Sequence, residues 1–468
     1  MKGQKIFSGL LAAVFCLSGC ALFSSCREGG GESSAPREYG ENYHPEKQTV
    51  DKDLTAGMMY IAYEGARYNN VDYEKGLQTM KNLGVTTIRF DLPKREIYTD
   101  KTTVNEEAKK LSKDIVSCAQ ELGIRVIGAI SGQWTNGGWW ENEGKYPKRD
   151  TEEGSYYLQW LDDYEYFIEK CVSDFPEITL WEIENEFNGV ASDTYLDPAD
   201  GSYTLKEKAE IYTDMMYRAS RAVHEVDPDN EVVLGGLTEL AGLGTTGGNA
   251  KFLQYMYDCI FSGDWPSPYP DDYFQIACWH PYTFTDFDPD EFVGENDKIY
   301  EVIRRNEGKD KKVIFSELGF SDASISQRTI VNLMKSVFDT IRDRLPYVET
   351  FCWFRAFNDY NDKSWGGDTV LVSYGLFYDP NFEYEGSGNN KYQGVLYAPG
   401  EPKPQAYAFQ EYAGGSGSLT LMMDKGVIAG NENFGDDEPL PKRYGELTYA
   451  ELLTRTKSLY EDYKKGNG

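Results

Sequence analysis

Residues 178–188 read Ile-Thr-Leu-Trp-Glu-Ile-Glu-Asn-Glu-Phe-Asn, a β-branched and apolar run that ends abruptly in Asn185-Glu186. A continuous apolar run is typical of a parallel strand that is covered on both faces. A carboxylate just past its last apolar residue would lie at the rim of the sheet, where such sheets place their chemistry. A second run of this kind, from Lys312 to Gly319, ends in Glu317. The sequence therefore predicts two buried strands, each with a Glu at its C-terminal tip.

Short apolar runs alternate with longer amphipathic stretches from Ala56 onward, which is the pattern of successive βα units. Strands are predicted at 57–62, 86–90, 125–130, 178–183, 231–235, 274–279, 312–315 and 349–354. Helices are predicted at 73–83, 105–122, 156–174, 205–226, 250–261, 297–305, 326–345 and 404–412. Eight such units favour an α/β fold, a closed (β/α)8 TIM barrel with long βα-loop insertions. An open doubly wound sheet is the alternative, but no Gly-rich phosphate turn follows the first strand.

The N-terminus is predicted to be a targeting segment. Lys2 and Lys5 flank the start of an apolar stretch, 6–17, that is too short to span a bilayer as a stable helix, and Leu17-Ser-Gly-Cys20 follows it. This segment resembles a bacterial lipoprotein signal, in which Cys20 becomes the lipidated N-terminus. An ordinary signal peptide is the alternative. We expect an exported protein that is lipid-anchored at the outer face of a bacterial membrane, with no other membrane contact.

The rest of the chain divides into three parts. Residues 21–52 lack hydrophobic periodicity and are rich in Gly, Ser and charges, which predicts a disordered tether. Residues 53–416 form the predicted barrel domain. Residues 417–468 form a C-terminal extension that ends in an amphipathic helix over 449–464, which either packs on the barrel or trails behind it.

Composition restricts the class of partner. The formal net charge is −30, from 47 Lys and Arg against 77 Asp and Glu, which argues against nucleic acid and anionic membranes because phosphates would be repelled. The chain contains 35 Tyr and 9 Trp, and flat aromatic faces with polar edges suit the stacking of sugar rings. Five Cys lie in the predicted body without metal-ligand spacing, so that buried free thiols are expected. We expect a monomer without a metal or another cofactor.

Residues just past each strand would share one face of a closed barrel. They combine two carboxylates with cationic, aromatic and amide side chains: Arg89, Asp91, Gln133, Trp134, Asn185, Glu186, His280, Tyr282, Glu317, Trp353 and Arg355. Such groups are costly to desolvate together unless each has a partner and a task. The sequence therefore predicts an active site at this face.

These strand ends resemble those of retaining glycoside hydrolases of clan A, the (β/α)8 group that includes families 5 and 39. The matching pieces are Ile88-Arg-Phe90, Trp181-Glu-Ile-Glu-Asn-Glu186, His280-Pro-Tyr282, Ser316-Glu-Leu-Gly319 and Trp353. The resemblance covers nearly the whole barrel. It departs from family 5 at the end of the third strand, where Ser131-Gly-Gln-Trp134 stands in place of a His.

The resemblance also implies roles for single residues. Glu186 would be the general acid/base and Glu317 the nucleophile, and Asn185 would bond the sugar 2-hydroxyl. Arg89 and Tyr282 would position Glu317, and Trp353 would form the floor of the sugar subsite. His280 matches the clan's His on the sixth strand, with a purely structural His as the alternative.

Retaining hydrolysis places demands on the two carboxyl groups. They lie roughly 5 to 5.5 Å apart, one donates a proton to the leaving group, and the other attacks the sugar and forms a covalent glycosyl-enzyme. We expect Arg89 to hold Glu317 ionised and that negative charge to raise the pKa of Glu186. The partner would be a β-linked poly- or oligosaccharide, and the sequence leaves open which glycan is cleaved.

Two loops and two other functions remain as alternatives. Residues 133–141 carry Trp134, Trp139 and Trp140, which predicts either a sugar-stacking wall or a loop folded over its own aromatics. The acidic stretch 286–297 is expected to be a solvated charge run rather than a Ca²⁺ loop.

A non-catalytic carbohydrate-binding surface lipoprotein is the main competing function. A metal-dependent hydrolase is disfavoured because the only His residues are His44, His224 and His280.

Overall fold

The computed structural model describes residues 54–60, 73–131, 146–189, 203–238, 248–283, 287–358, 370, 373–379, 400–419 and 448–465. The predicted signal segment, Cys20, the tether and Trp134 lie outside these ranges. Within them, no helix combines the length and the apolar character needed to cross a membrane.

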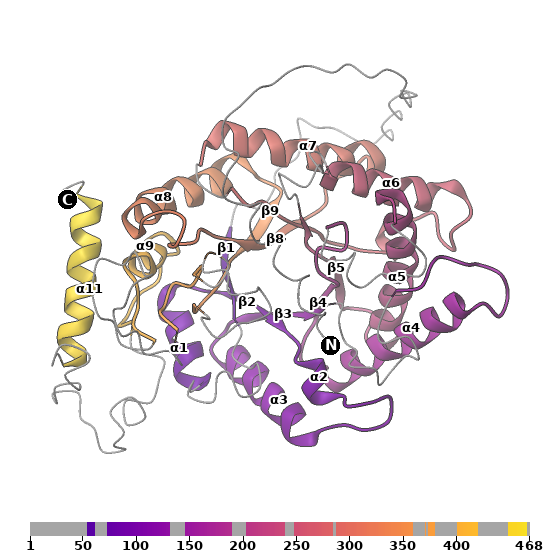
Figure 1. The fold of residues 1–468 in the computed structure, drawn as a ribbon, viewed down its shortest axis with the longest axis horizontal. Coiled ribbons are helices and arrows are strands. Elements are labelled where there is room, and N and C mark those ends of the chain that lie inside the picture. The colour runs from indigo at the N-terminus through magenta and orange to yellow at the C-terminus, as the bar shows by residue number, and fades with distance from the viewer. Residues whose placement is uncertain are drawn as a thin grey trace, which may run out of the picture.

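Parallel strands form the centre of the molecule (Figure 1). They are β1 (Thr55–Met59), β2 (Thr87–Asp91), β3 (Arg125–Ile130), β4 (Leu180–Ile183), β5 (Glu231–Leu234), β6 (Leu237–Thr238), β7 (Ala277–His280), β8 (Val313–Leu318) and β9 (Val348–Trp353). Their order is β5-β4-β3-β2-β1-β9-β8-β7-β6. A parallel bridge between Val233 and Ile276 joins β5 to the segment before β7, and β6 pairs with β7. The barrel is therefore closed, with β5 and β6 sharing its fifth position.

Helices form a ring around this barrel (Figure 1). They are α1 (Tyr73–Leu83), α2 (Lys94–Ile97), α3 (Glu106–Glu121), α4 (Tyr156–Asp174), α5 (Leu205–Val226), α6 (Gly248–Ser262), α7 (Pro289–Glu307), α8 (Gln327–Arg344), α9 (Pro404–Tyr412), α11 (Tyr449–Lys464) and the short 3-10 helix η5 (Pro270–Asp272). Gly84 and Gly123 follow α1 and α3 closely with φ of 90° and 74°, a left-handed conformation that Gly adopts without steric cost. The TIM-barrel prediction is confirmed.

The strands separate two apolar clusters because successive side chains point to opposite faces. The larger cluster lies between the strands and the helices and includes Trp181, Trp279 and Trp353. The smaller cluster fills the barrel interior: Ile127, Leu180, Val233, Ile276, Cys278, Ile314 and Cys352. Polar side chains that follow the interior parity along β2, β4, β7 and β8 therefore meet inside the barrel, above this apolar floor.

Among the helices, the largest correction concerns the one before β8. Helix α7 begins at Pro289, whereas the sequence predicted a helix from residue 297 and a charged loop before it. Asp288 caps this helix by accepting hydrogen bonds from the backbone N–H groups of Asp290 and Glu291. Carboxylates are favourable in the first turn of a helix, because they face the positive end of its dipole. The acidic residues in the described part of this stretch therefore begin a helix.

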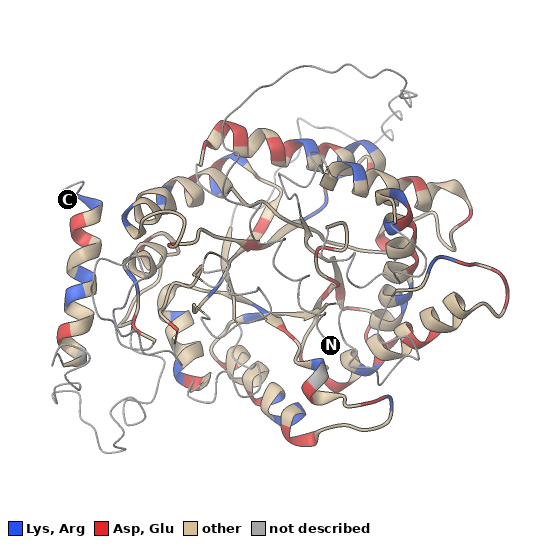
Figure 2. Cartoon of the chain, viewed as in Figure 1, with Lys and Arg blue, Asp and Glu red and all other residues tan. Residues whose placement is uncertain are grey.

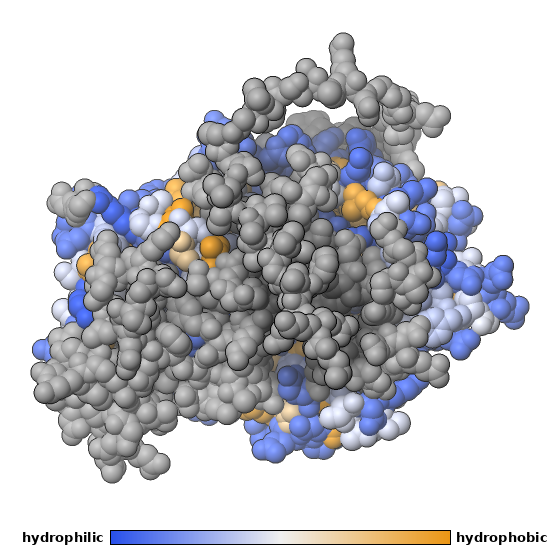
Figure 3. Space-filling model, in the orientation of Figure 1, coloured by the Kyte–Doolittle hydropathy of each residue, from blue (hydrophilic) through white to orange (hydrophobic). Residues whose placement is uncertain are grey.

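Charge is concentrated on the outer helices, whereas most of each strand is uncharged (Figure 2). The described rim of the molecule is mostly hydrophilic in the space-filling view, with small hydrophobic spots (Figure 3). Helix α11 packs against α8 and α9, so that this part of the C-terminal extension lies on the barrel.

Candidate active site

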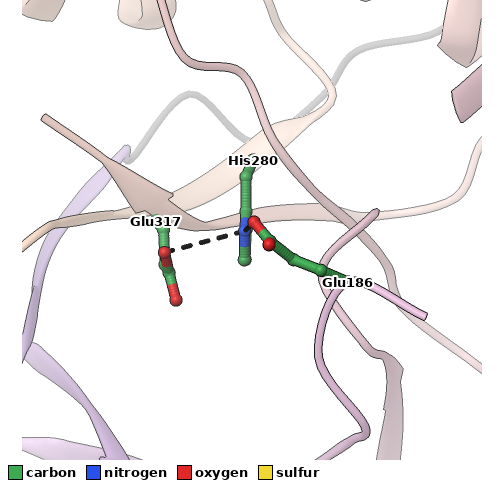
Figure 4. Close-up of side chains that lie close together, drawn as sticks. All are labelled: Glu186, His280 and Glu317. Carbon is green, nitrogen blue, oxygen red and sulfur yellow. Dashed lines mark hydrogen bonds and ion pairs between the residues drawn. The ribbon is translucent and has the colours of Figure 1, made fainter. Parts of the chain in front are cut away.

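Glu186 and Glu317 face one another across the barrel, with His280 between them (Figure 4). Nδ1 of His280 lies 2.8 Å from Oε1 of Glu186 and 3.7 Å from Oε2 of Glu317. One oxygen of each carboxylate and a ring nitrogen of His280 all lie within 4.8 Å of one another. This spacing is that of a retaining carboxylate pair, since inverting enzymes hold the two groups roughly 6.5 to 9.5 Å apart to admit a water.

The chain after β4 is bent to present Glu186. Glu184 and Glu186 have φ of 69° and 50°, a left-handed conformation that is unfavourable for non-glycine residues and is therefore held by its surroundings. The carboxylate of Glu184 is buried and accepts hydrogen bonds from Tyr146 and Tyr164. The backbone N–H of Glu186 donates to the carbonyl of Gly236 at 2.8 Å. These contacts fix the direction in which Glu186 leaves the strand.

A bulge in β8 presents Glu317. Phe315 pairs with Phe351 and Leu318 pairs with Trp353, so that Ser316 and Glu317 together oppose Cys352 alone. Consecutive residues of a regular strand point to opposite faces, and a bulge re-aims them. Both side chains turn toward the site as a result: Ser316 bonds His280, and Glu317 bonds Arg89.

Arg89 is the central cation of the site and is 1% exposed. Its guanidinium donates two hydrogen bonds to Glu182, at 2.7 and 3.0 Å, one to Oε1 of Glu317 at 2.8 Å and one to Oδ1 of Asn185 at 2.9 Å. Tyr282 donates to the other oxygen of Glu317 at 3.0 Å. The structure thus places Arg89 and Tyr282 on Glu317, as the resemblance implied, and shows that Glu182 takes two of the four hydrogen bonds that Arg89 donates to these oxygens.

The pKa shifts run opposite to the expectation from sequence. Burial raises the pKa of Glu186, but the hydrogen bond and charge of His280 outweigh it and lower the pKa overall. Burial also raises the pKa of Glu317, and the charge of Glu186 adds to this, so that the pKa is raised although His280 and Arg89 oppose the shift. Burial lowers the pKa of His280, but the two carboxylates outweigh it and raise the pKa overall. The directions differ from the expectation because burial is the largest influence on the pKa of Glu317, whereas the close hydrogen bond of His280 lowers the pKa of Glu186.

The aromatic floor is also corrected. Trp353 is fully buried, and its ring packs near Phe320 and Phe409 of α9 on the helix side of the strand. It therefore cannot touch a sugar. Phe354, the next residue, is partly exposed, and its ring lies edge-on to Tyr282 and Tyr374, with centroids 6.3 and 5.5 Å apart. Phe354 is thus a partly exposed aromatic side chain beside Tyr282, which bonds Glu317.

Three residues of the site were missed in the sequence: Glu182, Ser316 and Phe354. A signal existed for Glu182, because it interrupts the apolar run of β4 just as Arg89 interrupts that of β2. Opposite charges inside two nearby buried strands indicate an ion pair, since a lone buried charge is very costly. The sequence contains no comparable signal for the bulge that turns Ser316 inward.

Among the described residues, the group that could hold a metal ion is the same Glu186, His280 and Glu317. Two carboxylates and an imidazole are suitable ligands for a divalent ion. The same side chains have protein partners without an ion: Arg89 and Tyr282 bond the two oxygens of Glu317, and His280 lies between Ser316 and Glu186. An acid–base pair accounts for this arrangement.

The comparisons agree with this site. The family model for Cellulase (glycosyl hydrolase family 5) matches residues 52–354, and no curated protein matches the chain. A β-glycosidase from Pyrococcus horikoshii shares 14% identity at a TM-score of 0.51, covering 79% of this chain and 95% of that one. A β-glucosidase from Thermotoga maritima in complex with glucoimidazole shares 14% identity at a TM-score of 0.50, covering 79% and 99%.

A family 39 glycoside hydrolase from Bacteroides cellulosilyticus WH2 shares 18% identity at a TM-score of 0.48. The match covers 78% of this chain and 65% of the length of that hydrolase. The β-glycosidase and β-glucosidase structures share the fold, and the family model covers well over half of the chain, including both Glu186 and Glu317. The missing His after β3 does not remove the chain from the family. The chain belongs to glycosyl hydrolase family 5, and its (β/α)8 barrel is that of a retaining β-glycoside hydrolase.

Proposed function

We propose that the protein cleaves β-linked poly- or oligosaccharides by double displacement, with Glu186 as general acid/base and Glu317 as nucleophile. The observation that carries the assignment is the pattern of donors. Glu317 accepts hydrogen bonds from Arg89 and Tyr282 on its two oxygens, which direct and stabilise a carboxylate. Glu186 instead contacts His280, which can exchange a proton with it.

The chemistry follows from these contacts. A carboxylate oxygen of Glu317 attacks the anomeric carbon while the glycosidic oxygen leaves with the proton of Glu186. Forming the ester removes the negative charge of Glu317. That charge favoured the protonated form of Glu186, so that Glu186 can now act as a base. Glu186 then takes a proton from water, the water oxygen attacks the anomeric carbon, and Glu317 is released as a carboxylate.

Azide rescue tests the assignment of roles. Glu186→Ala should still form the glycosyl-enzyme from an activated aryl β-glycoside, whose leaving group needs no proton, and azide should then give the β-glycosyl azide. Glu317→Ala should give the α product, because azide occupies the space below the ring. Reversed anomers would show that the acid and the nucleophile are exchanged. Two fully active variants would exclude catalysis by this pair and favour a carbohydrate-binding protein.

Chelation separates this mechanism from a metal-dependent one. Glu186 and Glu317 supply proton transfer and nucleophilic attack without a Lewis acid, so that hydrolysis should be unchanged after dialysis against EDTA. Loss of activity that returns with Zn²⁺ would assign Glu186, His280 and Glu317 to a metal site instead.

We also propose that the protein is exported and lipid-anchored at the cell surface. Support comes from the basic start, the apolar stretch and Leu17-Ser-Gly-Cys20. Cys20→Ala should abolish membrane association or processing without altering the activity of the body of the protein. Partitioning of wild type and variant into detergent measures this, and an equal partition of the two would exclude lipidation at Cys20.

A further inference from the structure

The further inference concerns Ser316, which lies behind the catalytic pair and touches no substrate. Its hydroxyl is fully buried and is within hydrogen-bond distance of three groups: Oε1 of Glu182 at 3.0 Å, Nε2 of His280 at 3.0 Å and Sγ of Cys278 at 3.0 Å. A hydroxyl has one proton to donate and two lone pairs to accept with. Only one of the three neighbours can therefore receive the Ser316 proton.

Glu182 is the neighbour that receives it. Its two oxygens already accept the guanidinium fork of Arg89, which makes Glu182 an ionised group that accepts hydrogen bonds and cannot donate them. The backbone N–H of Gly236 also donates to Oε1 of Glu182, at 3.2 Å. Burial raises the pKa of the Cys278 thiol, which therefore stays protonated and donates to Ser316. If Ser316 donated to His280 instead, its contact with Glu182 would be left without a proton.

The direction of the bond to His280 follows. With its proton given to Glu182, Ser316 can only accept from His280, so that Nε2 of the imidazole carries a proton. Nδ1 then faces Oε1 of Glu186 at 2.8 Å, and this contact requires a proton on one of the two atoms. We propose that Ser316, oriented by Glu182, is a positioning residue that fixes His280 in the Nε2-protonated form and so keeps the acid proton shared between His280 and Glu186.

This inference rests on the proposed function and deepens it. The charged or titratable groups that face His280 are Glu186 beyond β4, Glu317 on β8, Arg89 on β2 and Tyr282 just after β7, and the uncharged Ser316 on β8 faces Nε2. The raised pKa of His280 and the lowered pKa of Glu186 agree with a proton that rests on the ring and moves to Glu186 as the leaving group departs. The β8 bulge, which turns Ser316 and Glu317 to the same side, links the nucleophile and this relay in one structural feature.

The tautomer can be measured without reference to activity. The chain has three His, so that ¹⁵N-histidine labelling of the full-length protein gives three imidazole systems, and His44→Gln and His224→Gln assign the other two. On raising the pH, His280 should lose its proton from Nδ1 and keep it on Nε2. A neutral His280 protonated on Nδ1 would overturn the proposal, whatever the fate of the catalytic assignments.

Substitution of Ser316 tests the consequence for catalysis. In Ser316→Ala, Nε2 loses its acceptor, and the ring should donate from Nδ1 to ionised Glu186, leaving the pair one proton short. The basic limb of kcat/KM should move down by about one pH unit, with the loss confined to substrates whose poor leaving group needs the proton. An activated aryl glycoside should react at nearly the wild-type rate.

Two further variants separate this role from a structural one. Ser316→Thr keeps the hydroxyl and should restore the wild-type pH profile, and Cys352→Ala creates a cavity of similar size in the barrel interior without touching the relay. An unchanged basic limb in Ser316→Ala, or an equal loss with good and poor leaving groups, would refute the positioning role. Reversed anomers in the azide experiment with an Nε2-protonated His280 would leave the role of Ser316 in fixing the tautomer intact, but would mean that His280 faces the nucleophile instead of the acid.

Discussion

At the scale of single residues, the site depends on how the N–H groups of the Arg89 guanidinium are shared among neighbouring side chains. Bidentate pairing with Glu182 neutralises the guanidinium, and the remaining N–H groups reach Glu317 and Asn185. If Arg89 served Glu317 alone, the buried pair would hold the nucleophile too tightly for attack. Glu182 therefore leaves Glu317 oriented by Arg89 but only partly neutralised, which agrees with its raised pKa.

This electrostatic arrangement predicts a pH profile displaced upward. Glu317 must be ionised to attack, and its pKa is raised from 4.5, so the acidic limb of kcat/KM should lie above 4.5. The acid proton is lost when His280 deprotonates. The pKa of His280 is raised from 6.5, so the basic limb should lie above 6.5. Initial rates with an unactivated β-linked oligosaccharide between pH 4 and 10 would measure both limbs. An acidic limb below 4.5 would contradict the raised pKa of Glu317.

Two neighbouring aromatics should respond differently to truncation. Trp353→Ala removes a fully buried ring from the interface with α9, and the free energy of unfolding should fall by about 3–5 kcal/mol. Phe354→Ala removes a partly exposed ring beside Tyr282, and KM should rise with a smaller change in stability. Denaturant unfolding and Michaelis–Menten kinetics of both variants provide the comparison. An unaffected KM in Phe354→Ala would show that this ring does not contact the sugar.

The position of these two rings could have been predicted from strand parity. Arg89, Glu182 and Cys352 all point into the barrel, so that Trp353, one residue after Cys352, must point to the helices. The carboxylates, Arg89, His280 and Tyr282 were predictable because each ends or follows an apolar run at the same rim. The pKa directions were not, because they depend on the burial of Glu317 and on which carboxylate lies closer to Nδ1 of His280: Glu186 at 2.8 Å, against 3.7 Å for Glu317.

At the scale of elements, the interruption between β5 and β6 is what admits His280. Gly236 lies in this interruption, donates its N–H to Glu182 and accepts from the N–H of Glu186. A Cβ at Gly236 would lie 2.0 Å from Nε2 of His280. No real Cβ approaches a neighbour so closely, and the ring is fixed by Ser316 and Glu186. A continuous strand with a side chain at this position would exclude the imidazole. The break between β5 and β6 therefore leaves room for it.

Gly236→Ala should consequently disable the site. His280 would have to move, and its contact with Glu186 would be lost, so that kcat should fall by about 10²-fold, the contribution of general acid catalysis at its lower bound. Gly294→Ala on α7 is the matched control, because nothing lies within 4 Å of a Cβ there and activity should be unchanged. Wild-type kcat in Gly236→Ala would mean that the ring does not occupy this place in solution.

Element boundaries were predictable where caps and periodicity agreed. Helices α1, α4, α5, α9 and α11 begin and end at the predicted residues, because a cap or Gly and an apolar stripe mark the same limits. Helix α7 was predicted eight residues short, since Pro289 and the following acidic residues suggested a loop by composition alone. Pro and carboxylates are in fact favoured in a first helical turn. The division of the fifth strand into β5 and β6 depends on His280, a contact distant in sequence.

At the scale of the whole molecule, chemistry and stability are separated in space. The reacting groups lie at the C-terminal ends of the strands, whereas α11 packs outside α8 and α9 (Figure 1). Glu411 of α9 binds Lys464 at 2.6 Å and also accepts a hydrogen bond from Tyr460. Thr456 donates to Glu401 at 2.7 Å. The C-terminal helix is thus part of the folded body, and these three contacts of α11 involve no residue of the site.

This separation predicts that damage to α11 changes stability and leaves the chemistry intact. Leu452→Ala removes a fully buried side chain, so the free energy of unfolding should fall by about 2–5 kcal/mol and Tm by several degrees, while kcat and KM at 25 °C stay at wild-type values. Leu453→Ala, at a half-buried position of the same helix, is the control and should cost less. Calorimetry and initial rates measure the two effects. An unchanged Tm in Leu452→Ala would show that α11 does not pack on the barrel in solution, and a lowered kcat would show that the helix supports the site after all.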